Sequence, residues 1–125
     1  MTINLYAAWI GFLLGALSGA IAGLFFDRET WLGGYVDWRR RMVRLGHISF
    51  FGIGLLNLGL FLTVETLSVQ AGVRLPAYLM IVGAVTMPLV CYLSAFRKGF
   101  RHLFFIPAGV VTLALAVFTW TLVVA

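Results

Sequence analysis

Residues 38–57 read WRRRMVRLGHISFFGIGLLN, a cluster of arginines that leads directly into an uncharged apolar run. Arginines favour the anionic phosphates of lipid headgroups, and an apolar run of about 20 residues is long enough to cross the hydrocarbon core of a bilayer. Because the core offers no water to the backbone polar groups, a segment that crosses it must be helical. The stretch therefore predicts a membrane helix that is anchored at a basic end.

The composition of the whole chain is typical of a membrane protein. Of the 125 residues, 62% are hydrophobic and 10% are charged, and the net charge is +5. A soluble domain carries far more charge than this. The basic residues lie in short junctions between apolar runs rather than on one face, which argues against a nucleic-acid partner and makes the lipid bilayer the first expected partner. Cys91 is the single cysteine, so no intrachain disulfide can form.

Four uncharged runs have the length of a membrane span. No lysine or arginine precedes Arg28, so we expect the first run to be a retained helix rather than a cleaved export signal. The predicted fold is all-α, a single four-helix transmembrane domain over residues 1–125 that packs as an up-down bundle. The predicted helices cover residues 5–26, 45–64, 75–96 and 103–124, and residues 27–44 form an interfacial loop.

The connections between these runs differ sharply in charge. Residues 27–44 and 97–102 together contain eight of the nine basic residues, whereas residues 65–74 contain only Arg74. Positively charged loops stay in the cytoplasm, which places the first and third connections there and both termini on the extracytoplasmic side. The predicted location is the plasma membrane or a bacterial inner membrane.

The first predicted helix carries glycines at an unbroken four-residue spacing. Such a stripe lets another helix approach closely, because small residues bring two backbones together in lipid. Packing within the chain is the plainer interpretation; the alternative is a groove for lipid or for other membrane protein subunits. Asn57 falls near the middle of the second helix, where we expect an interhelical hydrogen bond, or else a contact to a carried lipid or small molecule. The stripe consists of Gly11, Gly15, Gly19 and Gly23.

The two histidines, His47 and His102, each lie at the cytoplasmic start of a predicted helix. The second and fourth helices run in the same direction, and in an up-down bundle they face each other across the core. A glycine follows each histidine after seven residues, Gly54 and Gly109, which is about two helical turns and leaves room on the same face. Because neutral imidazole is a common axial ligand of iron, the pair predicts a b-type haem with His47 and His102 as its ligands.

Three basic residues at the same end, Arg44, Lys98 and Arg101, are the candidates for binding the haem propionates. The function that follows is a small electron-transfer subunit. Two other interpretations of the histidines remain open: they reach toward the headgroups, or they bind a quinone or a proton. The alternative function is a cofactor-free accessory subunit of a larger membrane complex. The sequence contains no catalytic motif, so an enzyme is not expected.

Overall fold

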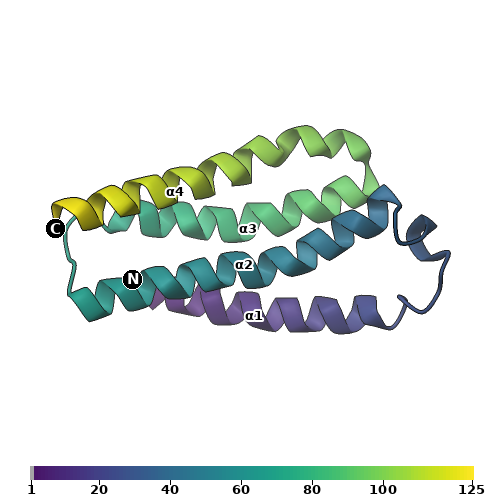
Figure 1. Ribbon diagram of the computed structural model, residues 1–125, viewed down its shortest axis with the longest axis horizontal. Helices are drawn as coiled ribbons and strands as arrows, with labels where there is room; N and C mark the ends of the chain where they lie inside the picture. Colours follow the sequence, from purple (N-terminus) through teal and green to yellow (C-terminus); the bar gives the residue numbers. More distant parts are fainter. Residues whose placement is uncertain (1) are drawn as a thin grey trace.

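The computed structural model describes residues 2–125, and helices form almost all of that part (Figure 1). No strand occurs among the described residues. Four helices are long and apolar enough to cross a membrane, which confirms the predicted helical class and the predicted number of helices of that length. In chain order the elements are α1 (Thr2–Gly23), the 3-10 turn η1 (Trp31–Gly33), α2 (Trp38–Leu67), α3 (Arg74–Phe96), the 3-10 segment η2 (Lys98–Phe104) and α4 (Phe105–Val124).

The surface of this fold is apolar along its length. Large aliphatic side chains such as Leu17, Leu55, Leu89 and Leu113 are about half exposed or more. Such a surface would be unfavourable in water, because monomeric soluble proteins rarely expose extended apolar patches. In a bilayer the same side chains contact lipid tails, so the exposure agrees with a membrane protein.

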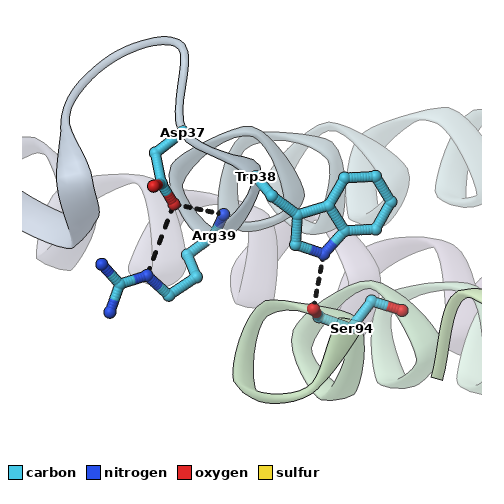
Figure 2. A network of polar contacts seen from close by, with 4 residues as sticks. All are labelled: Asp37, Trp38, Arg39 and Ser94. Atoms are coloured by element: carbon cyan, nitrogen blue, oxygen red, sulfur yellow. Dashed lines mark hydrogen bonds and ion pairs between the residues drawn. The ribbon is translucent and has the colours of Figure 1, made fainter. Parts of the chain in front are cut away.

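Helix α2 begins at Trp38, seven residues earlier than the sequence predicts, and the arginine cluster forms its first turns. The cause is an N-cap: Oδ1 of Asp37 accepts a 2.9 Å hydrogen bond from the backbone N–H of Arg39 (Figure 2). This bond holds the pKa of the exposed Asp37 below its ordinary value. The indole Nε1 of Trp38 then donates a 2.7 Å hydrogen bond to the carbonyl oxygen of Ser94, which ties the start of α2 to the end of α3.

Helix α4 begins later than the sequence predicts, at Phe105 rather than residue 103. The residues before it, including His102, form the 3-10 segment η2. Pro107 lies in the first turn of α4, a position where its missing N–H breaks no helical hydrogen bond.

Successive helices run in alternating directions and lie beside one another in chain order (Figure 1). Helix α2 packs extensively on both α1 and α3, whereas α4 packs mainly on α3. Near the C-terminal end of α4, Phe118 joins a buried cluster with Leu60 and Val64 of α2 and with Val73 and Ala77. Elsewhere in the described chain, α4 and η2 have at most marginal contact with α2. The arrangement is therefore a row of helices, in which α2 and α4 share this one cluster and do not face each other along their length.

Candidate functional site

A buried polar junction joins the first three helices. Asn4 of α1 and Asn57 of α2 have no exposed surface. Nδ2 of Asn4 donates to Oδ1 of Asn57 at 2.7 Å and to the carbonyl oxygen of Ala77 at 3.0 Å. Nδ2 of Asn57 donates to the carbonyl oxygens of Ile53, at 3.0 Å, and Met80, at 3.4 Å. The interhelical hydrogen bond expected of Asn57 is present, and both of its N–H groups are used within the protein, which leaves neither for a carried ligand.

His47 lies on the side of α2 that faces α1. Its ring is half-buried beside Gly19, where a Cβ atom would collide with Cε1 of the imidazole. Nδ1 is 3.3 Å from the hydroxyl oxygen of Ser18, and the ring meets Phe51 edge-on with centroids 5.4 Å apart. The glycine in α1 therefore provides the space in which this imidazole is held.

His102 has a different environment. It is exposed on η2. Gly109 is exposed on α4, where an added Cβ would meet nothing within 4 Å, whereas Gly54 is buried on α2 and faces Phe12 of α1. The structure thus places the two histidines, and the glycine that follows each, in separate surroundings.

The three basic residues predicted to bind propionates also contact different parts of the chain. Arg44 donates a 3.0 Å hydrogen bond to the carbonyl oxygen of Tyr35, and its guanidinium lies 4.0 Å from the centroid of that ring. Nζ of Lys98 lies 5.4 Å from the centroid of the Trp38 ring. Arg101 is exposed and bonds only to the carbonyl oxygen of Lys98, at 3.5 Å. Of the predicted site residues, the structure brings Arg44 and His47 together in one small pocket of about 150 Å³.

A larger groove runs between α1 and α3, with α2 as its floor. Its volume is about 550 Å³ and its lining is almost wholly apolar. Small residues from all three helices line the groove: Ala7, Gly11, Gly54 and Ala84. Tyr6 and Tyr92 supply its two phenol groups. The sequence does not locate this groove, because its walls come from three segments far apart in the chain; of the glycine stripe, Gly11 alone lines it.

The glycine stripe of α1 packs mainly on α2. A Cβ at Gly11 would lie 3.1 Å from the carbonyl oxygen of Phe50, and one at Gly15 would lie 2.6 Å from the Phe51 ring. Gly19 adjoins His47, whereas a Cβ at Gly23 would meet nothing within 4 Å. Three of the four glycines therefore serve contacts within the chain, as the plainer interpretation expects.

The basic end of the molecule is the end that holds the α1–α2 connection and η2 (Figure 1). Across residues 2–125 the structure contains one ion pair, between Arg39 and Asp37 at 3.4 Å. Arg40 is only 5% exposed and donates to the carbonyl oxygens of Phe26, at 2.7 Å, and Arg28, at 3.2 Å. Most of the positive charge at this end is thus not balanced by carboxylates.

The residues that the structure describes include no cluster of three His, Cys, Asp or Glu side chains that could hold a metal ion. Comparison with protein-family models, with curated proteins and with solved structures finds no match.

Proposed function

We propose that the protein is a cofactor-free accessory subunit of a larger membrane protein complex, and that the groove between α1 and α3 accepts an apolar transmembrane helix of the partner. The observation that carries this proposal is the groove itself, about 550 Å³ of apolar space that opens on the flank of the row of helices. Transmembrane helices associate through close packing at small residues, because lipid tails remove the hydrophobic driving force. Ala7, Gly11 and Ala84 offer such a surface.

The proposed partner is a helix rather than a soluble segment because the groove lies between spanning helices. Its lining runs from Ile3 near the start of α1 to Tyr92 near the end of α3, so it extends over much of the membrane depth. A partner at that depth must satisfy its own backbone hydrogen bonds, as a helix does.

The proposed orientation puts both termini on the extracytoplasmic side of a plasma membrane or a bacterial inner membrane. Its support is the charge distribution: the connection between α1 and α2, the first turns of α2 and the η2 region contain eight of the nine basic residues. Reporter enzymes fused after Ala125 and inserted at Gly72 test this. With a reporter enzyme that is active only outside the cytoplasm, we expect both fusions to be active. With a reporter that is active only in the cytoplasm, we expect both to be inactive, and activity there would reverse the assignment.

Photo-crosslinking in native membranes tests the groove. A photoreactive amino acid at Ala7 or Ala84 should give one adduct of discrete protein mass, whereas the same probe at Leu113 or Leu115, exposed on α4, should give lipid adducts only. Lipid adducts alone from the groove positions, or an adduct with the mass of two copies of this chain, would contradict the proposal. As a second measure, Ala84→Phe should fill the groove and reduce co-purification of the partner, and Leu113→Phe should not.

A b-type haem ligated by His47 and His102 is the second candidate. The observation in its favour is that His47 and Arg44 lie together at the basic end, although the pocket of about 150 Å³ that they share would have to widen to hold a macrocycle. Bis-histidine ligation would also require η2 to pack across α2, and in the described chain these elements have at most marginal contact. The accessory role needs no such rearrangement, so we place it first.

A further inference from the structure

The small pocket at the seam of α1 and α2 lies apart from the groove. It is lined by the end of α1 and by the early turns of α2. Its volume of about 150 Å³ corresponds to about five water molecules at ~30 Å³ each, enough for a phosphodiester but not for a macrocycle. The lining residues are Gly19, Ala22, Phe26, Val43, Arg44, His47 and Ile48, among which there is no carboxylate.

The hydrogen bonds of His47 indicate which ring nitrogen is available to a ligand. The hydroxyl of Ser18 donates its single proton to the carbonyl oxygen of Gly15 at 3.1 Å. With that proton on Gly15, the Ser18 oxygen accepts from His47 Nδ1, 3.3 Å away, in the tautomer that carries its proton on Nδ1. Nε2 is therefore the nitrogen left for a ligand, and it donates a hydrogen bond to an anion when the ring is protonated.

Arg44 adds a positive charge that no carboxylate neutralises. Within residues 2–125 the one ion pair involves Arg39, not Arg44. Nη1 of Arg44 is held by the carbonyl oxygen of Tyr35 at 3.0 Å, and the ring of Tyr35 lies beneath the guanidinium. These contacts orient the guanidinium while leaving its other N–H groups without a partner in the described chain. A guanidinium presented in this way matches a phosphate oxygen.

The pocket lies toward the basic end of the two helices, where headgroups and acyl chains would meet. Arg44 contacts Tyr35 of the connecting loop, and aromatic residues of this kind mark the membrane interface. His47 lies nine residues beyond Trp38, about 13 Å along the helix axis. Beyond the two polar groups the wall consists of Gly19, Ala22 and Ile48, which are suited to the glycerol and the first methylenes of a lipid.

We propose that this pocket binds the phosphate of an anionic phospholipid, with Arg44 and His47 as its polar contacts and the Gly19–Ala22 side of α1 against the lipid chain. The inference is independent of the groove and of the accessory role. Such a site differs from a general attraction of anionic lipid to the basic end. In the site, two named residues bind the lipid, whereas in a general attraction every basic residue contributes.

Lipid retention measured by native mass spectrometry tests the proposal on the full-length protein. The protein is reconstituted in nanodiscs of equal parts phosphatidylglycerol and phosphatidylcholine, extracted into detergent and scored for bound lipid. The wild type should retain phosphatidylglycerol preferentially, and Arg44→Gln should reduce that preference about tenfold, the effect of losing a hydrogen bond between charged groups. His47→Gln should reduce it as well.

The matched control is Arg101→Gln, which removes the same charge at the same end from exposed η2 and should leave the lipid preference unchanged. An equal loss in Arg101→Gln, or no loss in Arg44→Gln, would overturn the proposal. Circular dichroism checks the fold. If Arg44→Gln unfolds, Arg44→Lys serves instead: it keeps the charge but lacks the planar N–H donors of the guanidinium, and it should still retain less lipid than the wild type. Excess inorganic phosphate should not displace the lipid; displacement would assign the pocket to free phosphate instead.

Discussion

Nδ2 of Asn4 lies 2.7 Å from Oδ1 of Asn57, and neither residue has any exposed surface. Asn57 in turn bonds to the carbonyl oxygen of Met80, so one pair of amides connects α1, α2 and α3. Within a membrane this contact specifies which helices pack together, because an unpaired amide in hydrocarbon is costly. Apolar contacts specify less, because an aliphatic neighbour can be exchanged for lipid.

We predict that the two asparagines are energetically coupled. Asn4→Leu and Asn57→Leu should each destabilise the fold, and the double variant should cost less than the sum of the two. Interhelical hydrogen bonds in membranes contribute about 0.6–1.7 kcal/mol, which is the coupling expected here. Unfolding in mixed detergent micelles measures it as a double-mutant cycle.

Thr63→Val is the matched control for this cycle. The Thr63 hydroxyl bonds only to the carbonyl oxygen of Gly59 in its own helix, at 2.7 Å, and lies at the exposed surface. Its loss should change stability little, and it should show no coupling to Asn4→Leu. Additive effects of the two asparagine variants would contradict the role given to the pair.

The glycines of α1 supply a second prediction. A methyl group at Gly19 would collide with Cε1 of His47 and lie 3.0 Å from Nδ1, whereas a methyl group at Gly23 would meet nothing within 4 Å. Gly19→Ala should therefore destabilise the protein, because the usual cost of overpacking, about 1–3 kcal/mol, exceeds the gain of up to about 1 kcal/mol from the helix propensity of alanine. Gly23→Ala should be neutral or stabilising by up to about 1 kcal/mol, because alanine favours the helix. Thermal unfolding of the two variants side by side measures the difference, and equal effects would count against the packing.

Arg40 supplies a third prediction, which concerns the loop between α1 and α2. The residue is 5% exposed, and its guanidinium bonds to the carbonyl oxygens of Phe26 and Arg28 and lies 4.8 Å from the centroid of the Phe26 ring. Arg40→Gln should release these contacts and open residues 24–37. Hydrogen bonds to charged groups contribute about 1.5–3 kcal/mol, so cleavage through local opening should accelerate about tenfold or more.

Chymotryptic cleavage after Trp31 or Tyr35 measures this opening in detergent-solubilised protein. Chymotrypsin is preferred because the substitution itself removes a tryptic site. The control is Arg41→Gln, an exposed neighbour on α2 whose guanidinium has no hydrogen bond in the described chain. If both variants are cleaved at the wild-type rate, Arg40 does not hold the loop.

The number of helices was predictable because the bilayer fixes the length and polarity of a spanning segment. The side of each helix that faces another was not predictable. Leu60 is 3% exposed and Leu89 is 52% exposed, yet in a chain surrounded by lipid both positions favour the same kind of residue. The early start of α2 depended on the Asp37 cap and on Trp38 reaching Ser94, a contact between residues far apart in the sequence.

The same reason limited the prediction of the candidate site. His47 and His102 share a sequence position relative to their helices, and that position alone suggested a common site. Their surroundings depend on helix order: α2 lies between α1 and α3, so His47 packs on Gly19, while η2 leaves His102 exposed. Asn57 was predictable because an amide in a membrane helix needs a partner, but its partner Asn4 lies too near the helix start to signal burial.

Absorption spectroscopy separates the proposed accessory role from the haem alternative. We expect protein expressed with ample haem and purified in mild detergent to show no Soret band, oxidised or reduced with dithionite, because the His47 pocket of about 150 Å³ is too small for a macrocycle and contains no residue of η2 or α4. A band that His47→Ala and His102→Ala each abolish would contradict this expectation and establish bis-histidine ligation. A band lost only in His47→Ala would indicate one axial histidine. In that case Arg44→Gln should shift its reduction potential, because it removes the charge beside the ligand, and Arg101→Gln should not.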